Sequence, residues 1–588
     1  MGKYYGINRQ SISNDAFSPF VRHALVATED NRFFEHKGID VLSLARVFFK
    51  SMLLGDRDQG GGSTISQQLA KNLFPRKDFR MFSLPINKIR EMFIASELEE
   101  VYDKEEILTL YLNTVAFGEN VYGIEAASLR FYSKPSIELN IDEAATLIGM
   151  LAANTAYNPR MHPAQALKRR NVVLSRMHTQ GFISEEQKNE LSKKPIDLDY
   201  RLLDVNRGLA PYFRQYLKKE LILLLGDQEL IETGGLRIHT TIDANIQAFA
   251  EHAVGNQLKK LQAEFDLHWK GRKAWEKHPE VYDRALKNLE PYKKLEVEGY
   301  SHEDIIKELS VKKNRLIYTH AGEEWKEISC IDSLNHYIQL LNSGFLAMDP
   351  KSGAILAWVG GANYQYLPYD HVMANRQAGS TFKPFVYASA LQMGMDPCRF
   401  IANEKRTYED YDNWSPGNSN GDYEGFYSLK GGLMRSLNTI TAKVMVDVGP
   451  ANVVEMARGA GIASPLPEVP SLALGTADVS LYEMVSAYTA FANYGAPVDA
   501  FYISRIEDSD GNILYQNDDT TFRKRVFSEE LGAMMINMLE AVVDSGTARS
   551  ARTVYGLRSD LAGKTGTTQN NADGWFIGFT RGIVAGVW

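Results

Sequence analysis

Three short motifs whose residue types suit covalent catalysis occur in order along the chain. They are Ser380-Thr-Phe-Lys383, Ser436-Leu-Asn438 and Lys564-Thr565-Gly566. A lysine three residues after a serine lies one helical turn away on the same face, where it can take the serine's proton. The second motif supplies a hydroxyl and an amide to relay protons. The third supplies charge and hydroxyls for a carboxylate, and a glycine that lets a substrate backbone approach. Together the motifs predict an acyl-transfer site.

The surroundings of the motifs predict how that site is tuned. Ser380 follows Gly379 at the start of a helical segment, where the field of the helix N-terminus stabilises an anion. Lys383 can act as a base only if its pKa is lowered, which burial near Lys564 would achieve. Ser436 would then bridge the two lysines as a proton relay. The oxyanion needs two backbone N–H donors, worth about 2.7–4 kcal/mol each. Ser380 itself and a residue on the Lys564 strand are the expected donors.

A second group of polar motifs lies in the first hundred residues. Glu29-Asp-Asn-Arg-Phe33, followed by His36 and Gly38, is by itself compatible with an ordinary helix start that carries a capping acid. Gly61-Gly-Ser63-Thr64-Ile-Ser-Gln67-Gln68 is a glycine-rich loop that leads into a helix, and its donors suit phosphate or sugar hydroxyls. Lys88-Ile-Arg90-Glu91 adds cations and a second carboxylate.

These residues meet the requirements of glycosyl transfer from a lipid diphosphate. The acceptor hydroxyl needs an ionised carboxylate as general base, which we assign to Glu29. The leaving diphosphate needs cations, which we assign to Lys71, Lys88 and Arg90. Attack opposite the leaving group would invert the anomeric centre.

The elements that must position these residues differ between the two ends of the chain. At 588 residues the chain is too long for one ordinary core. Residues 15–190 have mainly helical patterns, with helices expected at Arg90–Glu99, Lys104–Asn113 and Asp142–Leu151. Within residues 195–345 the first expected element is a strand at Leu236–Ile242. A charged helical stretch from Ala248 to Lys312 follows, and we interpret it as a solvated insertion or connector.

From Gly344 onward the pattern is α/β. One strand is expected before a turn at Lys351-Ser-Gly353 and a second strand after it. The further expected elements are helices at 381–393 and 433–448, strands around Lys564 and Trp575, and a last strand at 582–588.

Composition narrows the classes of partner. The net charge of −8 argues against nucleic acid. Between Lys71 and Arg90, however, six basic residues face one acidic residue, and Phe74, Phe79, Met81, Phe82 and Leu84 are interleaved with them. This mixture suits an anionic membrane surface, and a solvated helix face over core aromatics is the alternative.

Cysteine spacing argues against a metal site, and hydropathy argues against a membrane-spanning segment. Cys330 and Cys398 could form one bridge or stay as two free thiols, and no metal-binding spacing occurs among the cysteines and the 12 histidines. No apolar run reaches about 18 residues, and the first 20 residues have no signal-peptide pattern. The sequence itself therefore predicts no membrane anchor.

The C-terminal motifs resemble those of the penicillin-binding transpeptidases. Gly379-Ser-Thr-Phe-Lys-Pro384, Ser436-Leu-Asn-Thr439 and Lys564-Thr-Gly-Thr-Thr568 match the three family motifs, and Asp573-Gly-Trp-Phe-Ile-Gly578 resembles the next strand. The resemblance implies that Ser380 attacks the D-Ala-D-Ala end of a peptidoglycan stem peptide and that β-lactams inhibit covalently. It also implies that Asn438 holds the peptide, that Thr565 and Thr567 bind its carboxylate, and that the Thr567 amide completes the oxyanion hole.

The N-terminal motifs resemble those of the family 51 glycosyltransferases, whose lysozyme-like domain polymerises lipid II. The matching segments are Glu29–Gly38, Gly61–Gln68, Lys88–Glu91, Tyr111–Asn113 and Arg169–Leu174. By this resemblance Glu29 and Glu91 are the two family carboxylates. This sequence departs from the family pattern at two positions. Asn87 stands where the family usually has a basic residue, and Thr109 stands where it usually has a glutamate. A divalent metal is possible for this half, and no other cofactor is expected.

The combined resemblance is to the class A, bifunctional penicillin-binding proteins. It implies a mostly α glycosyltransferase domain at 1–195, a connector at 196–343, and an α/β (α+β) transpeptidase domain at 344–588 whose central antiparallel sheet is flanked by helices. The partners would be lipid II, nascent peptidoglycan and the outer face of the cytoplasmic membrane. The family's membrane helix and its C-terminal helix are expected to be missing here. A hydrolase of the same fold and a non-catalytic penicillin sensor are the alternatives.

Overall fold

The computed structural model describes residues 8–9, 12–42, 63–74, 76–77, 83–119, 121–200, 208–273, 275–276, 278–517 and 523–588. Gly61 and Gly62 of the glycine-rich loop, and residues 78–82 of the basic stretch, lie outside these ranges. The chain divides into two compact units. The N-terminal unit is Lys3–Val205 with Gln228–Thr233, and the C-terminal unit is Met1–Gly2, Asn206–Asp227 and Gly234–Trp588.

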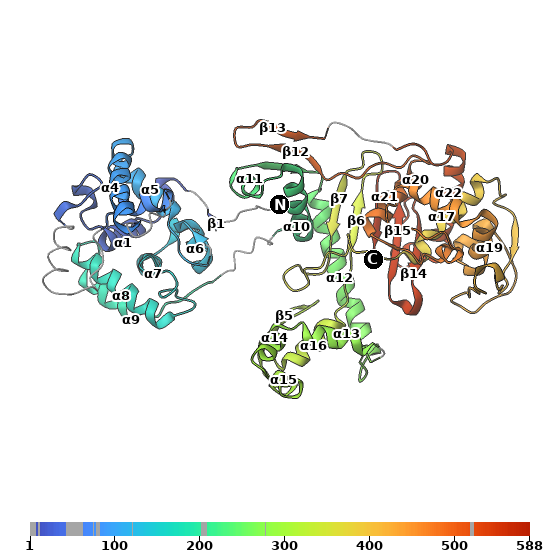
Figure 1. The fold of residues 1–588 in the computed structure, drawn as a ribbon, viewed down its shortest axis with the longest axis horizontal. Helices are drawn as coiled ribbons and strands as arrows, with labels where there is room; N and C mark the ends of the chain where they lie inside the picture. The colour runs from blue at the N-terminus through green and yellow to red at the C-terminus, as the bar shows by residue number, and fades with distance from the viewer. Residues whose placement is uncertain are drawn as a thin grey trace. The chain divides into compact units, whose positions relative to one another are not determined.

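The N-terminal unit is mostly helical, as predicted (Figure 1). Several of its helices begin at capping boxes, in which the first side chain and the side chain three residues later satisfy each other's backbone N–H groups. Asp103 with Glu106 and Asn140 with Glu143 are two examples. The elements up to residue 200 are β1 (Asn8–Arg9), η1 (Asn14–Ala16), α1 (Pro19–Glu29), η2 (Phe33–Glu35), α3 (Ile65–Leu73), α4 (Ser83–Val101), α5 (Lys104–Thr114), β2 (Val121–Tyr122), α6 (Ile124–Tyr132), η4 (Ser136–Glu138), α7 (Ile141–Met150), α8 (Pro163–Thr179) and α9 (Glu185–Lys193).

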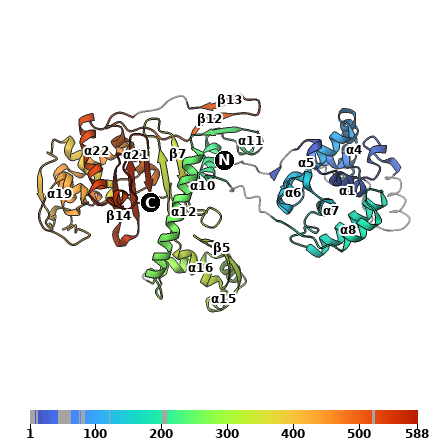
Figure 2. The same ribbon diagram turned by 180° about the vertical axis from the view of Figure 1, so that it is seen from behind.

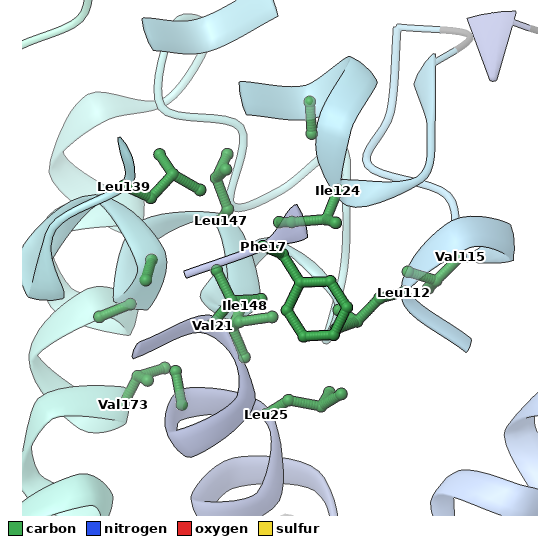
Figure 3. Packing of buried hydrophobic residues seen from close by; sticks show 14 of the residues in the cluster. Phe17, Val21, Leu25, Leu112, Val115, Ile124, Leu139, Leu147, Ile148 and Val173 are labelled. Atoms are coloured by element: carbon green, nitrogen blue, oxygen red, sulfur yellow. The ribbon is translucent and has the colours of Figure 1, made fainter. Parts of the chain in front are cut away.

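The core of this unit holds α1 among α5, α7 and α8. Val21 and Leu25, one turn apart on α1, are fully buried against Leu112, Ile148 and Val173 (Figure 3). Each such buried side chain contributes roughly 1.5–3 kcal/mol relative to an exposed one. This packing holds the end of α1 in place, and Glu29 is the last residue of that helix.

The C-terminal unit is built on a five-stranded antiparallel sheet of order β14-β15-β16-β6-β7. Its strands are β6 (Phe345–Met348), β7 (Ile355–Val359), β14 (Ala562–Thr567), β15 (Gly574–Phe579) and β16 (Val584–Val587). The strands expected around the turn at Lys351–Gly353, near Lys564 and Trp575, and at the end of the sequence are all present.

Helices cover both faces of the sheet, as predicted. Because side chains alternate along a strand, Ala347 and Ala357 point to one face, where they pack against Val254 of α12 (Ala244–His268). α12 lies beside β7 in both views (Figure 1, Figure 2). On the other face α21 (Leu481–Ala492) packs so closely that a Cβ at Gly586 would lie 2.5 Å from Val485.

The remaining elements of this half surround that layered centre. They are α10 (Pro211–Leu225), β3 (Arg237–Thr240), β8 (Arg376–Gln377), η5 (Gly379–Phe382), α17 (Lys383–Gln392), β9 (Phe400–Ala402), η6 (Glu409–Tyr411), β10 (Phe426–Ser428), α18 (Leu429–Met434), α19 (Asn438–Val448), α20 (Pro450–Ala460), η7 (Pro470–Leu474), β11 (Asp478–Val479), β12 (Ile503–Glu507), β13 (Ile513–Gln516), α22 (Glu529–Asp544), α23 (Ser550–Thr553) and η8 (Gln569–Asn571). The helix α11 (Gln228–Thr233) belongs to the N-terminal unit. The expected strand at 236–242 is β3, which pairs with β12.

The part of the charged stretch that lies beyond α12 packs with the residues after it into a small core of its own. Tyr292, Ile305 and Leu334 are buried together, so the stretch is more than the solvated surface that its composition suggested. Its elements are α13 (Pro279–Lys287), α14 (Glu290–Val297), α15 (His302–Leu309), β4 (Lys313–Thr319), β5 (Gly322–Ile328) and α16 (Cys330–Gln339). The β4–β5 hairpin was not predicted.

The described residues contain neither a membrane-spanning helix nor a disulfide bond. In the ranges that the structure describes, no helix is both long enough and apolar enough to span a bilayer. Cys330 and Cys398 are both free thiols, so the disulfide alternative is wrong for this structure.

Candidate active sites

The Ser380 turn lies against the Lys564 strand. Ser380 belongs to the 3-10 turn η5, which leads directly into α17, so the expected start of a helical segment is confirmed with a tighter first turn. Gly379 has a φ of 54°, and a Cβ at this position would lie 2.9 Å from the carbonyl oxygen of Thr567. A glycine is therefore needed for the nucleophile to approach β14 this closely.

Ser436 lies at a break between two helices. The single helix expected at 433–448 is wrong, because α18 ends at Met434 and α19 begins at Asn438. Ser436 adopts a left-handed backbone conformation, with a φ of 59°. For a residue other than glycine this costs about 1–3 kcal/mol, and such strain is found mainly at functional sites. The break places the Ser436 hydroxyl between two lysines.

The two motif lysines are fully buried on either side of Ser436. Lys383 Nζ donates to the carbonyl oxygen of Ser436 at 2.7 Å and to Asn438 Oδ1 at 2.7 Å, and it lies 3.3 Å from Ser436 Oγ. Lys564 Nζ donates to Ser436 Oγ at 2.9 Å and to the carbonyl oxygen of Thr565 at 3.0 Å. Both side chains are 0% exposed. The structure thus brings together Lys383, Ser436, Asn438 and Lys564.

Burial sets the protonation of these lysines. It lowers the pKa of Lys383 well below its usual range, and the charge of Lys564 lowers it further. Burial also lowers the pKa of Lys564 to about 7. At neutral pH Lys383 can therefore have a free lone pair, as a base requires, while Lys564 is still partly charged and can act as a cation.

The rest of the third motif has packing partners that were not foreseen. Gly566 was expected to admit a substrate backbone, but a Cβ here would first meet the carbonyl oxygen of Ala378 and the methyl group of Thr381, each at 2.9 Å. The hydroxyl of Thr565 lies 2.6 Å from that of Thr547, a residue that no motif had singled out. Thr567 ends β14 with its side chain exposed.

We expect Lys564→Met to stabilise the C-terminal unit most at low pH. The pKa of Lys564 is about 7 in the folded state and about 10.5 when unfolded, so below pH 7 the fold must bury an ammonium group. This cost shrinks as the pH rises from 7 toward 10.5. The rise in melting temperature caused by the substitution should therefore be larger at pH 6.5 than at pH 9.5. An equal rise at both pH values would contradict this, and Lys351→Met, at an exposed site, is the control.

In the N-terminal unit, Glu29 accepts a hydrogen bond from α3. Gln68 Nε2 donates to Glu29 Oε2 at 3.0 Å, and the hydroxyl of Tyr111 donates to Gln68 Oε1 at 2.9 Å. Burial and the charge of Glu29 raise the pKa of Tyr111 above its usual range, so the phenol stays protonated as the donor. Tyr111 lies in a predicted motif, but its role in orienting Gln68 was not predicted.

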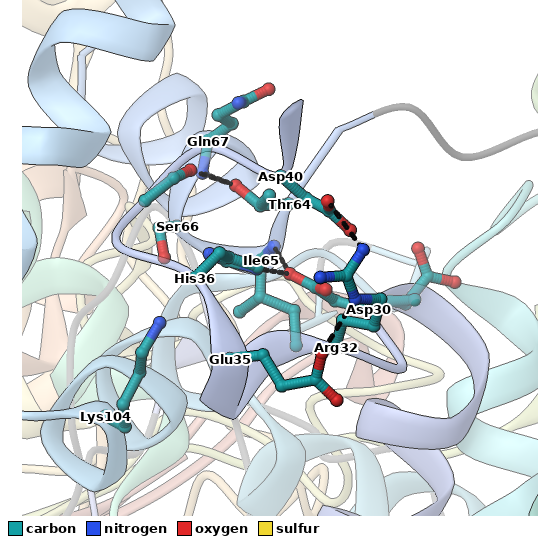
Figure 4. Close-up of polar contacts among 12 residues, drawn as sticks. Asp30, Arg32, Glu35, His36, Asp40, Thr64, Ile65, Ser66, Gln67 and Lys104 are labelled. Atoms are coloured by element: carbon teal, nitrogen blue, oxygen red, sulfur yellow. Dashed lines mark hydrogen bonds and ion pairs between the residues drawn. The ribbon is translucent and has the colours of Figure 1, made fainter. Parts of the chain in front are cut away.

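Asp30 holds the start of α3 beside the end of α1. Its Oδ2 accepts from the backbone N–H of Ile65 at 3.1 Å and lies 3.0 Å from His36 Nε2 (Figure 4). Thr64 caps the same helix, since its hydroxyl accepts from the backbone N–H of Gln67 at 3.2 Å and donates to the carbonyl oxygen of Gly38 at 2.6 Å. The Gln67 side chain is buried, and among the residues that the structure describes neither of its amide atoms has a hydrogen-bond partner.

Glu91 lies in a second cluster of charges. Arg76 Nε donates to Glu91 Oε1 at 2.8 Å, and Lys88 Nζ lies 3.6 Å from Glu91 Oε2 and 2.5 Å from Ser63 Oγ. Burial lowers the pKa of Lys88, although the charge of Glu91 opposes this. Arg76 was counted among the basic residues of this stretch but was not proposed as a site residue.

The structure also locates the two remaining predicted cations and the two residues that differ from the family pattern. Lys71 lies exposed in the last turn of α3, and Arg90 lies half-exposed on α4. Asn87 donates to the carbonyl oxygens of Lys77 and Ser83, both at 2.7 Å, and so holds the segment that carries Arg76. Thr109 donates to Asn14 Oδ1 at 3.2 Å, as a local packing contact.

Two arginines of α8 lie near the end of α1. Arg176 donates to the carbonyl oxygen of Thr28 at 2.6 Å. Burial and the charge of Arg176 lower the pKa of Arg169, while the charge of Glu29 opposes this. Arg169 begins a predicted motif, but it was given no role.

Comparison with known proteins identifies both halves. Residues 1–178 match the transglycosylase family model, residues 268–341 the penicillin-binding protein middle domain, and residues 343–582 the penicillin-binding protein transpeptidase domain. Penicillin-binding protein 1A of Aquifex aeolicus is 34% identical over 100% of this chain and 81% of that protein. Penicillin-binding protein 2D of Bacillus subtilis is 31% identical over 99% of this chain and 74% of that protein.

A solved structure shows the same fold. It is penicillin-binding protein 1A from Haemophilus influenzae, with a TM-score of 0.59, 24% identity, and coverage of 89% of this chain and 82% of that one. The chain belongs to the class A, bifunctional penicillin-binding proteins. It is a peptidoglycan synthase that joins a glycosyltransferase to a serine-type transpeptidase, as the motifs predicted.

Proposed function

We propose that the C-terminal unit cross-links stem peptides through an acyl group on Ser380. The observation that carries this proposal is the Ser436 hydroxyl held between two buried lysines, 3.3 Å from Lys383 Nζ and 2.9 Å from Lys564 Nζ. This arrangement supplies a neutral amine as base, a hydroxyl as relay and a second amine that can hold a positive charge.

In the proposed first step, Lys383 accepts the Ser380 proton while Ser380 Oγ bonds to the carbonyl carbon of the penultimate D-Ala. The backbone N–H groups of Ser380 and Thr567 stabilise the oxyanion. When the C–N bond to the terminal D-Ala breaks, the proton on Lys383 passes through Ser436 to the leaving nitrogen. Asn438 holds the peptide, and Thr565, Thr567 and Lys564 bind the carboxylate of the leaving D-Ala.

In the proposed second step, the amine of a neighbouring stem peptide attacks the acyl-enzyme. Lys383 takes a proton from this amine, the Ser380 ester bond breaks, and the serine oxygen regains a proton. A peptide cross-link is formed, and the enzyme returns to its starting state. A β-lactam would enter at the first step and remain attached, because its leaving nitrogen stays tethered in the ring-opened product.

Peptide mapping after exposure to benzylpenicillin tests the site of acylation. The intact chain should gain the mass of one penicillin, and the added mass should lie on the fragment that contains Ser380. An adduct on another residue, or no adduct on folded protein, would overturn the assignment.

For the N-terminal unit we propose polymerisation of lipid II with inversion at the anomeric carbon. Glu29 takes the proton of the acceptor hydroxyl as that oxygen bonds to the donor sugar, and the lipid diphosphate leaves. The hydrogen bond from Gln68 Nε2 to Glu29 Oε2, at 3.0 Å, supports this role because it holds the carboxylate in place. Glu91 orients the cations Arg76 and Lys88, while Lys71, Lys88 and Arg90 hold the diphosphate. Ser63, Thr64, Gln67 and Gln68 line the sugar side of the site.

A divalent metal is possible for this half, and the proposed steps assign it no role. In the ranges that the structure describes, no three histidine, cysteine, aspartate or glutamate side chains converge as metal ligands.

We also propose that α4 lies on the outer surface of the cytoplasmic membrane. Leu84, Ile89 and Phe93 of this helix are 72%, 65% and 70% exposed. Lys88, which contacts the proposed diphosphate site, lies among them. An apolar surface with neighbouring cations suits the boundary where a lipid-linked diphosphate is presented.

A further inference from the structure

The loop between β9 and β10 makes a buried polar contact with the start of α19. Asn403, Asn418 and Thr439 are 1%, 8% and 5% exposed, and all three are hydrogen-bonded to one another. Buried polar groups are costly unless paired, so this contact holds a defined geometry. None of the three residues belongs to the proposed catalytic set.

Asn418 caps α19 from a distant segment. Leu437, the N-cap of this helix, supplies no side-chain hydrogen bond. Instead Asn418 Oδ1 accepts from the backbone N–H groups of Asn438 at 2.8 Å and of Thr439 at 3.2 Å. Its Nδ2 donates to Asn403 Oδ1 and to the carbonyl oxygen of Asp422, both at 2.8 Å. These bonds use both ends of the amide, so its orientation is determined.

The neighbouring Gly417 carbonyl orients the Asn438 side chain. Asn438 Nδ2 donates to this carbonyl oxygen at 2.8 Å, which turns Asn438 Oδ1 toward Lys383 Nζ at 2.7 Å. The Ser436 carbonyl oxygen accepts from the same Nζ at 2.7 Å. A neutral amine has two N–H bonds and one lone pair, so two close acceptors occupy both N–H bonds and leave the lone pair directed elsewhere.

We propose that Asn418 is a positioning residue for acylation. Together with the Gly417 carbonyl it orients the Asn438 amide, and this amide directs the lone pair of Lys383 toward the Ser380 proton. The inference rests on the proposed role of Lys383 as base. The activity of Lys383 as base would then depend on the loop that carries Asn418, about twenty residues before Asn438 in the sequence.

Two substitutions of Asn418 test the inference with a fluorescent penicillin as the probe. Asn418→Ala removes the cap and both donors, so the first-order acylation rate constant should fall about 10–100-fold. The dissociation constant of the non-covalent complex should rise as well, because Asn438 is also proposed to hold the peptide, so the rate constant at saturating penicillin is the quantity that reports on Lys383. Asn418→Asp keeps the acceptors toward α19, but its negative charge favours the protonated form of Lys383. The acidic limb of the acylation rate should therefore move to higher pH.

Matched variants separate this role from a purely structural one. Thr489, which is 0% exposed on α21, accepts from the backbone N–H of Val498 at 3.2 Å, far along the chain from these motifs. Thr489→Ala should lower the melting temperature while leaving the acylation rate constant and its pH profile unchanged. An Asn418→Asp protein with the wild-type rate constant and pH profile would overturn the inference. So would a Thr489→Ala protein that loses as much acylation rate as Asn418→Ala.

Lys383→Met distinguishes failure of the inference from failure of the proposed function. Wild-type acylation of Lys383→Met would overturn the proposed base itself. If Lys383→Met is inactive while both Asn418 variants acylate like the wild type, only the positioning role is wrong.

Discussion

Replacing Ser380 with alanine is expected to abolish covalent penicillin labelling and peptide cross-linking. The substitution removes the only oxygen that forms the acyl bond in the proposed mechanism, so acylation should fall at least about 10⁴-fold. Glycan polymerisation from lipid II should continue, because its proposed residues lie in the other compact unit. Gel fluorescence with a labelled penicillin and analysis of muropeptides after digestion measure the two outcomes.

Ser389→Ala is the matched control for this substitution. Ser389 is buried on α17, the helix that follows the turn carrying Ser380, and it donates to the carbonyl oxygen of Phe385 in the same helix at 2.9 Å. This variant should label and cross-link at close to the wild-type rate. Labelling that persists in Ser380→Ala would show that another residue is the nucleophile.

Replacing Glu29 with glutamine is expected to stop glycan polymerisation. The amide has nearly the same size as the carboxylate but cannot accept the proton of the acceptor hydroxyl, so the rate should fall about 10²–10⁴-fold. Penicillin labelling of Ser380 should be unchanged. Electrophoresis of glycan strands made from labelled lipid II in detergent or vesicles measures the effect.

Glu35→Gln is the control for Glu29→Gln. Glu35 is on the following turn, with its side chain 63% exposed, and it pairs with Arg32 at 2.8 Å. Loss of this surface pair should change polymerisation little, because exposed ion pairs contribute about 0–1 kcal/mol. A Glu29→Gln protein that polymerises at the wild-type rate would remove Glu29 from the reaction.

Local signals in the sequence predicted most of the fold that positions these residues. Helix-period patterns predicted a mostly helical N-terminal unit and three of its helices, α4, α5 and α7, but not the bounds of the others. Strand patterns predicted the strands on each side of Lys351–Gly353 and near Lys564. Motif order also predicted that Ser436 bridges Lys383 and Lys564, because each motif brings a chemical group that the others require.

What the sequence did not predict depends on contacts between distant segments. Helical propensity continues through Leu433–Val448, and only tertiary contacts explain the left-handed Ser436 that breaks it. The Asn418 cap joins residues 20 apart, and the Thr547–Thr565 contact joins residues 18 apart. Asn87 stands where the family usually has a basic residue, and its amide holds the segment that brings Arg76 to Glu91. None of these contacts leaves a periodic pattern.

The most direct test of the whole account is one incubation of the intact chain with lipid II, with and without benzylpenicillin. Without penicillin the product should be glycan strands joined by peptide cross-links, with release of D-Ala. With penicillin the strands should still form, while cross-links and D-Ala release disappear. Loss of strands on adding penicillin, or cross-links that persist in its presence, would contradict two separate active sites with Ser380 as the cross-linking nucleophile.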